Sequence, residues 1–272
     1  MPGVLYLIAT PIGNLEDITL RALRILKEVD VIACEDTRHT QHLLTHFSIS
    51  SPTISYHEHN EASRAAQLIE RLESGQSVAV VTDAGTPLVS DPGFRIVRSA
   101  IEKGIQVIAI PGASAVLTAL AGSGMPTDVF YFGGFLPPKQ GQRRKTLESC
   151  ATLEATLVFY EAPHRILETL EDLQAVMGDR QVSLARELTK MHEEFLRGTA
   201  SEVRTALAAR PAIKGEMTLL VSRERPAATE LLPLEEAVKR LVAGGLSRMD
   251  AIKQVARERG LAKREVYQQL EQ

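Results

Sequence analysis

Residues 78–94, VAVVTDAGTPLVSDPGF, decide how this chain folds. The first four residues are apolar without interruption, and after Thr82 the chain enters a loop rich in Gly, Pro, Thr and Asp that begins at Asp83. A strand without polar positions is typical of a parallel sheet that is covered on both faces. Ligands of such sheets bind at the carboxyl ends of the strands. The stretch therefore predicts a buried parallel strand that ends in a ligand-binding loop.

The same succession of strand, polar loop and helical periodicity occurs five times in residues 4–112. The predicted strands are residues 4–10, 29–34, 53–56, 77–82 and 106–110. This alternation predicts right-handed βαβ crossovers and a mainly parallel sheet. Parallel strands end at one edge of their sheet, so we expect the five following loops to converge on one crevice. In the first loop, Asn14 and Asp17 are suited to be the N-cap and the first-turn acid of the next helix.

The pattern changes after residues 121–126, AGSGMP. Further strands are predicted at residues 129–135, 156–160, 182–185, 194–198 and 217–222, and helices at 163–177 and 200–209, which together indicate a mixed α/β domain with hairpins. We therefore predict an α/β protein with an N-terminal domain (1–113), a second domain (114–223), a linker (224–233) and a helical tail (234–272).

The tail contains three predicted helices, at residues 234–243, 247–259 and 262–270, separated by Gly244-Gly245 and Gly260. Two short helices around a tight turn, with basic residues on them, have the outline of a helix-turn-helix. Such helical hairpins also serve as dimer or packing elements. The tail by itself leaves both roles open.

Composition excludes several classes of protein. With 272 residues, 44% of them hydrophobic and 24% charged, the chain is long and apolar enough to bury a sizeable core. Its two cysteines lie in ordinary helix and strand patterns, so we expect no disulfide framework. We expect a cytosolic protein without a membrane partner, because no signal sequence or apolar run of about 20 residues is present. The net charge of −3 argues against non-specific coating of nucleic acid, although basic residues cluster at 139–145 and in the tail.

Several known site types do not match the sequence. The sequence Gly122-Ser123-Gly124 does not follow a predicted strand and lacks the third glycine of a dinucleotide fingerprint, and no P-loop or G-x-S-x-G elbow occurs. We interpret Ser114 as a helix N-cap rather than a nucleophile. The histidines at positions 39, 42, 46, 57 and 59 lack the usual accompanying Cys or carboxylate, so we expect no metal site.

Charged side chains collect at the ends of the predicted strands. The acids are Glu35, Asp36, Asp83, Asp91, Glu161 and Glu187, and turn formation and capping account for about half of them. The others suit a ligand with ribose hydroxyls and a positive charge. Arg165, Arg186 and Lys190 are candidate phosphate clamps. An ion pair between Glu161 and Arg165 with a purely structural role is an equal alternative.

Nine motifs resemble those of one known family. They are TPIGNLEDITLRAL, CEDTRHT, HEHNE, VTDAGTPLVSDPGF, PGASA, GFLP, FYEAPHRI, RELTK and GEMTLLV, in order from about residue 5 to residue 221. Together they resemble the bacterial ribosomal RNA small subunit methyltransferase I family, a branch of the tetrapyrrole methylases. The resemblance implies a homodimeric two-domain enzyme that binds S-adenosylmethionine in its cleft. It also implies methyl transfer to the ribose 2′-hydroxyl of cytidine 1402 of 16S rRNA in the 30S subunit, with a tail that touches RNA.

Carried onto this chain, the resemblance implies a set of cofactor-binding residues. They are Pro11, Asp83, Ala84, Gly85, Thr86, Val89, Ser114, Ala115, Glu161 and Leu188. At Thr86 the wider superfamily has an acidic residue, so the hydrogen bonding there departs from its pattern. From the residues themselves, we expect Gly85 and Gly93 to let backbone amides approach a ligand, and helix starts after residues 91 and 114 to offer donors to a carboxylate.

The ribose hydroxyl is a weak nucleophile at neutral pH, so a general base would accelerate the reaction. The candidates are Glu35, Asp36, His39 and Glu187, and the sequence does not choose between them. For RNA contacts we predict Arg38, Arg143, Arg144, Lys145, Arg165 and Lys190. Two other classes of function remain open: a small-molecule methyltransferase of the tetrapyrrole or diphthine kind, and a non-catalytic RNA-binding or assembly factor that has kept the cleft.

Overall fold

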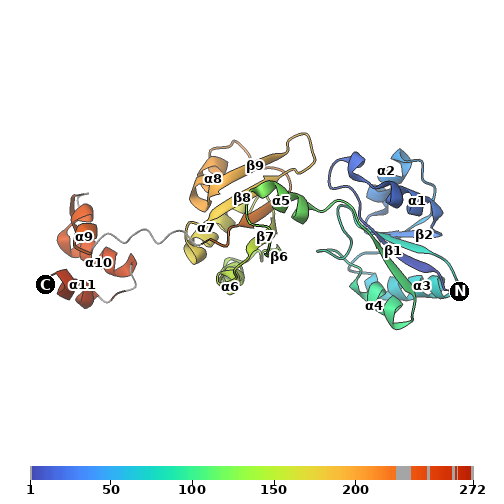
Figure 1. The fold of residues 1–272 in the computed structure, drawn as a ribbon, viewed down its shortest axis with the longest axis horizontal. Coiled ribbons are helices and arrows are strands. Elements are labelled where there is room, and N and C mark those ends of the chain that lie inside the picture. Colours follow the sequence, from blue (N-terminus) through green and yellow to red (C-terminus); the bar gives the residue numbers. More distant parts are fainter. Residues whose placement is uncertain (1, 225–233, 244–245, 259–260, 262, 271–272) are drawn as a thin grey trace. The chain divides into compact units, whose positions relative to one another are not determined.

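The computed structural model of the chain describes residues 2–224, 234–243, 246–258, 261 and 263–270. The chain divides into two compact units, Met1–Arg223 and Glu224–Gln272. The first unit contains two five-stranded sheets, and the described part of the second unit contains helices (Figure 1).

The first sheet is parallel throughout and has the order β3-β2-β4-β1-β5. Its strands are β1 (Val4–Ile8), β2 (Val31–Cys34), β3 (Thr53–Ser55), β4 (Val78–Val81) and β5 (Gln106–Ile110). They confirm the five predicted strands, β5 with the predicted bounds and the other four with somewhat shorter ones. Helices α1 (Leu20–Glu28) and α2 (Thr37–His46) cover one face, and α3 (Glu61–Glu73) and α4 (Phe94–Glu102) cover the other (Figure 1).

The central strand β4 explains this two-sided covering. Val78 and Val80 pack with residues of α3 and α4, whereas Ala79 and Val81 pack with residues of α1 and α2. All four are buried, because successive side chains of a strand point to opposite faces of the sheet. The apolar run at 78–81 therefore encodes a strand at the centre of a three-layer sandwich, and its loop emerges at the edge where the other parallel strands also end.

The second sheet is mixed and has the order β6-β7-β10-β8-β9. Strands β6 (Phe130–Phe135) and β7 (Thr156–Glu161) are parallel, whereas β8 (Gln181–Arg186), β9 (Glu194–Thr199) and β10 (Met217–Val221) complete the sheet through antiparallel pairs. Helix α5 (Ala115–Ser123) packs on one face. Helices α6 (Gln140–Cys150), α7 (Ile166–Met177) and α8 (Ala200–Ala208) pack on the other. The mixed α/β domain with hairpins predicted from the sequence is confirmed.

Local capping signals set the helix starts. The Ser114 side chain accepts a hydrogen bond from the Leu117 amide at the start of α5, as predicted. The Asn14 side chain accepts one from the Glu16 amide, but the helix that it caps is only the 3-10 turn Leu15–Asp17. A second cap, Thr19, then starts α1.

The second unit is a small helical body with its own core. Helices α9 (Leu234–Ala243), α10 (Arg248–Glu258) and α11 (Lys263–Leu270) surround Val238, Ala251, Ile252, Val255, Ala256 and Val266. Most of the predicted linker (225–233), the predicted separators Gly244-Gly245 and Gly260, and residues 259 and 262 at the ends of two predicted helices lie outside the described residues. Arg248, Lys253, Lys263 and Arg264 are exposed on α10 and α11. Among the described helices, none is both long and apolar enough to cross a membrane.

Candidate active site

A cavity of about 700 Å³ lies in the first unit, where both sheets contribute loops. The first sheet supplies Ile12 after β1, residues 82–86 and 89–91 after β4, and Ser114 and Ala115 after β5. The second sheet and its loops supply Phe135, residues 160–163, Ala185, Glu187, Leu188, Lys190 and residues 215–218. Cavities of this size bind small organic ligands. The carboxyl ends of β1, β4 and β5 thus form one wall, as the parallel sheet requires.

The loop after β4 is tied to the loop after β1. Thr10 and Gly85 exchange two backbone hydrogen bonds, of 2.9 and 3.1 Å, and the Thr10 hydroxyl donates to the Thr82 carbonyl at 3.0 Å. Gly85 has a φ of 86°, a conformation that glycine adopts without strain. Leu88 and Ser90 have φ values of 72° and 69°, which is unusual for residues with a side chain. Strained conformations of this kind gather at functional sites, where the surrounding structure enforces them.

Nine of the ten predicted cofactor-binding residues line this cavity. They are Asp83, Ala84, Gly85, Thr86, Val89, Ser114, Ala115, Glu161 and Leu188. Pro11 is absent from the lining, and its neighbour Ile12 is there in its place. The hydroxyl of Thr86, which stands where the superfamily has an acid, donates to the Ala113 carbonyl at 3.4 Å.

The expectation that Gly93 and the start of α4 offer donors to a ligand is wrong. The carboxylate of Glu61 on α3 already accepts hydrogen bonds from the Gly93 amide at 3.1 Å and the Arg95 amide at 3.3 Å. A negative side chain at a helix N-terminus satisfies these amides and interacts favourably with the helix dipole. The glycine is required by the backbone, because position 93 has a φ of 136°, a conformation that residues with a side chain rarely adopt.

The second wall contains a cluster of charged side chains, Glu187, Lys190 and Glu216, that are hydrogen-bonded to one another. The Glu187 carboxylate accepts from the Glu216 amide at 2.9 Å and from Lys190 Nζ at 3.0 Å, and Lys190 also pairs with the Glu216 carboxylate at 3.0 Å. The hydrogen bond from the Glu216 amide, followed by Lys190, lowers the pKa of Glu187 in spite of burial. Lys190 passes directly over the first loop, since a Cβ at Gly13 would lie 2.5 Å from Lys190 Cγ.

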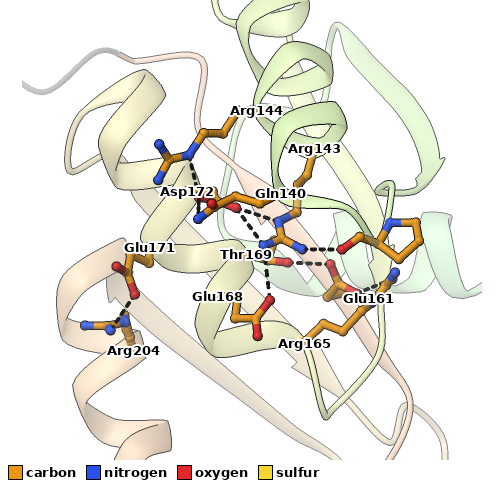
Figure 2. Close-up of polar contacts among 11 residues, drawn as sticks. Gln140, Arg143, Arg144, Glu161, Arg165, Glu168, Thr169, Glu171, Asp172 and Arg204 are labelled. Carbon is orange, nitrogen blue, oxygen red and sulfur yellow. Dashed lines mark hydrogen bonds and ion pairs between the residues drawn. The ribbon is translucent and has the colours of Figure 1, made fainter.

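Glu161, at the end of β7, accepts hydrogen bonds on both carboxylate oxygens from residues of the second domain (Figure 2). Its side chain is buried, and one carboxylate oxygen accepts from the Arg165 guanidinium and from the Ala162 amide at 2.7 Å. The other oxygen accepts from the Thr169 hydroxyl at 2.6 Å. The structural ion pair considered from the sequence is therefore present. Arg165 directs its guanidinium to Glu161, which leaves it poorly placed to clamp a phosphate.

The prediction that Arg143 contacts RNA is wrong, because its side chain is only 1% exposed. Its guanidinium contacts Asp172 and Glu168 (Figure 2) and also donates to the Pro138 carbonyl at 3.3 Å. Arg143 shares the buried face of α6 with Leu147 and Cys150, four and seven residues further along. Arg144 pairs with Asp172 at 2.7 Å but stays 42% exposed, and Lys145 is exposed.

Glu35, Asp36, Arg38 and His39 lie after β2 and do not line the cavity. Asp36 is the N-cap of α2, and its carboxylate accepts from the Arg38 amide at 2.8 Å and from the Arg38 guanidinium. The hydrogen bonds from Arg38 lower the pKa of Asp36 to about 2. Of the four candidate bases, the structure therefore brings only Glu187 to the cavity. No group of metal-ligating side chains occurs among the described residues.

Asp91 is the functional candidate that sequence reasoning underrated. It lines the cavity, and burial is the main cause that raises its pKa to about 6, with additional repulsion from Glu35 and Asp83. A hydrogen bond from Thr82 acts in the opposite direction. Its only signal in the sequence is an acid between Ser90 and Pro92, where turn formation is the ordinary explanation. A perturbed pKa in a cavity marks a candidate for acid or base chemistry.

Comparison with known proteins identifies the class to which this fold and cavity belong. Residues 4–204 match the family described as Tetrapyrrole (Corrin/Porphyrin) Methylases. Among solved structures, diphthine synthase aligns with a TM-score of 0.63 over 81% of this chain and 90% of its own, at 16% identity. A uroporphyrin-III C-methyltransferase from Thermus thermophilus, complexed with S-adenyl homocysteine, aligns with a TM-score of 0.57 over 80% of this chain and 97% of its own, at 21% identity. The chain has the fold of a tetrapyrrole methylase.

The particular branch follows from a relative of higher identity. The ribosomal RNA small subunit methyltransferase I of Halalkalibacterium halodurans is 51% identical over 271 residues, which cover 97% of this chain and 93% of the relative. The chain belongs to the ribosomal RNA small subunit methyltransferase I family, within the tetrapyrrole methylases.

Proposed function

We propose that this chain transfers a methyl group from S-adenosylmethionine to ribosomal RNA of the small subunit, at the ribose 2′-hydroxyl of cytidine 1402 of 16S rRNA. The observation that carries the proposal is the cavity between the loops of the two sheets, in a chain that is 51% identical to a ribosomal RNA small subunit methyltransferase I. The target nucleotide rests on the family resemblance.

The chemistry of the cavity fits the cofactor. Apolar side chains of Ile12, Val89, Leu188 and Met217 surround a few polar groups, which is the usual composition of a small-molecule site. Residues 84–86, Ser114, Ala115 and Leu188 would hold the cofactor. When bound, S-adenosylmethionine supplies a methyl group on a positively charged sulfur, and its displacement needs alignment at about 3 Å and exclusion of water, without a metal.

Exposed basic side chains support an RNA substrate. Arg38, with 89% of its side chain exposed, Arg144 and Lys145 would contact phosphates from the first unit, and Lys190 would do so from the cavity wall. In the second unit, Arg248, Lys253, Lys263 and Arg264 would do the same on α10 and α11. Phosphate contacts of this kind position RNA and weaken as salt is raised.

The proposed enzyme works as a homodimer. This part of the proposal rests on the family resemblance. Light scattering on the purified chain tests this part of the proposal. A monomer at micromolar concentration would contradict it.

A methyl-transfer assay tests the activity. The chain is incubated with methyl-labelled S-adenosylmethionine and 30S subunits from a strain that lacks the modification, and the expected product is one labelled cytidine ribose. Absence of transfer would refute the proposal. A variant that lacks residues 234–272 is expected to retain S-adenosylhomocysteine binding but to bind 30S subunits more weakly. Undiminished methylation of 30S subunits by that variant would remove the second unit from RNA recognition. A full-length chain that binds S-adenosylhomocysteine but methylates no 30S subunit would favour the small-molecule alternative.

A further inference from the structure

One part of the cavity combines a partly buried acid with an exposed aromatic ring. Asp91 comes from the loop between β4 and α4, Phe135 from the end of β6, and Tyr160 from β7, and all three line the cavity. Phe135 is 59% exposed, and its ring centroid lies 5.4 Å from that of Tyr160. This arrangement leaves one ring open to an incoming planar group.

The backbone of β6 explains why Phe135 lies there. The register between β6 and β7 shifts between Phe132 and Phe135, and Gly134 has a φ of 64°. A Cβ at Gly133 would lie 2.5 Å from the Phe159 ring, so only glycine permits this close approach to the core. A Cβ at Gly134 would lie 3.5 Å from the Ser90 hydroxyl, next to Asp91. Irregularities of this kind redirect side chains near active sites.

We propose that this part of the cavity is a nucleoside subsite, in which Phe135 stacks on the base of the target nucleotide and the Asp91 carboxylate accepts the proton of its ribose hydroxyl. The proposal rests on the proposed function, because it assumes an RNA substrate. A nucleotide stacked within a helix cannot enter a cavity, so the target must be single-stranded or turned out of its helix. Unstacked bases of RNA are commonly bound on aromatic side chains.

Proton transfer to Asp91 balances the reaction. The ribose oxygen forms a bond to the methyl carbon while the carbon–sulfur bond breaks. The bonding pair remains on sulfur, which loses its positive charge, and the hydroxyl proton passes to the Asp91 carboxylate and then to solvent. A base is most effective when its pKa lies near the working pH, and Asp91 meets this condition better than a carboxylate with an ordinary pKa.

The surroundings of the other acids favour Asp91 over them. Glu187 is held by the Glu216 amide and by Lys190, which lower its pKa, and Asp36, which does not line the cavity, forms an exposed pair with Arg38. The charges that act on Asp91 are those of Glu35, after β2, and Asp83, after β4, and the charge of Asp91 in turn acts on Tyr160 of the second sheet. Burial, followed by the Asp91 charge, raises the pKa of Tyr160, so its hydroxyl stays neutral.

Asp91→Asn tests the proton transfer. With saturating S-adenosylmethionine, the single-turnover rate on 30S subunits is expected to fall by about 10²–10⁴-fold. The wild-type rate is expected to rise with pH up to a plateau above pH 6 to 7, and the variant is expected to lose this rise. S-adenosylhomocysteine binding, measured by calorimetry, is expected to stay within about threefold. Asp128→Asn, which removes an exposed partner of Arg223 outside the cavity, is the matched control and is expected to behave as the wild type.

Two results would overturn the role of Asp91. The first is a retained pH dependence in Asp91→Asn. The second is an equal loss of rate and of S-adenosylhomocysteine affinity, which would make Asp91 a cofactor ligand. By contrast, a wild-type chain that binds S-adenosylhomocysteine and methylates no 30S subunit would refute the proposed function itself, so the two failures are distinguishable.

Substitutions at Phe135 test the stacking. Phe135→Leu, which keeps an apolar side chain but removes the ring, is expected to raise KM for 30S subunits about tenfold with little change in kcat. Phe135→Tyr is expected to restore the wild-type KM. Phe130→Leu changes a 41% exposed ring on the same strand that does not line the cavity, and it is expected to have no effect. Equal KM values for Phe135→Leu and Phe130→Leu would refute stacking on Phe135.

Discussion

Substitution of Asp172 by alanine should destabilise the first unit far more than an ordinary surface change. The Asp172 side chain on α7 is fully buried and accepts hydrogen bonds from Arg143 Nε and Arg144 Nε, both at 2.7 Å, and from Gln140 Nε2 at 3.2 Å. Without it, the buried Arg143 guanidinium keeps only the Pro138 carbonyl and Glu168, whose side chain is 69% exposed. Removal of one partner from a buried ion pair typically costs about 3–5 kcal/mol. We expect a loss of this size in the free energy of unfolding.

The neighbouring residue on the same helix provides the control (Figure 2). Glu171 is 58% exposed and makes a 2.8 Å pair with Arg204, so Glu171→Ala should cost no more than about 1 kcal/mol. Urea unfolding at pH 7, followed by circular dichroism, measures both variants. Costs for the two variants that agree within 1 kcal/mol would refute the reasoning that the Arg143–Asp172 pair anchors α6.

The pH dependence gives an independent check of the same pair. Burial alone would raise the pKa of Asp172, but the hydrogen bonds from Arg144 and Arg143 outweigh it and lower the pKa. A carboxylate with a lowered pKa stabilises the fold above its unfolded value, and this contribution is lost as the pH falls through the folded value. The difference in stability between the wild type and Asp172→Ala should therefore shrink below about pH 4.

Three further predictions follow from the cavity and from α6. Asp91→Asn should stabilise the fold at pH 7.5, because burial raises the pKa of Asp91 to about 6, which marks a carboxylate that the folded state disfavours when it is charged. The gain should shrink as the pH falls below about 6, and urea unfolding that shows no gain at pH 7.5 would contradict this reasoning. Gly13→Ala should displace Lys190 and weaken S-adenosylhomocysteine binding in calorimetry, whereas Gly141→Ala, where a Cβ meets nothing within 4 Å, should leave binding unchanged. Lys145→Ala should weaken 30S binding about two- to fivefold at low salt without loss of stability, because Lys145 is exposed. Arg143→Ala should lower the melting temperature, because Arg143 is buried. An equal effect of both substitutions on the melting temperature would count against the buried position of Arg143.

Local sequence signals predicted much of the fold. The apolar run of β4 indicated burial on both faces, and Ser114 indicated the start of α5, because these properties depend on residues close in sequence. The order of the strands could not be predicted in this way, since it is fixed by pairing between segments far apart in the chain. The capture of the Gly93 amide by Glu61, 32 residues away, is a contact of the same non-local kind.

The site was predicted less completely because side-chain direction decides it. The basic run at 139–145 suggested one RNA-binding surface, although helical spacing from Arg143 to Leu147 and Cys150 already indicates that one of its arginines faces inward. Asp91 reaches the cavity through a loop with positive φ at Leu88 and Ser90, conformations that residue preferences do not predict for these amino acids.

The cavity also bears on how the first unit unfolds. Its two sheets have separate hydrophobic cores, whereas Ile12 of the first loop packs with Val116, Leu188 and Leu220 beside the second sheet. A ligand that contacts both walls stabilises both halves by mass action, and this stabilisation grows with the logarithm of the ratio of its concentration to its Kd. A saturating ligand should therefore strengthen the coupling that Ile12 already provides between the two cores. The sharpness of thermal unfolding then becomes a measure of how firmly the ligand holds both walls at once.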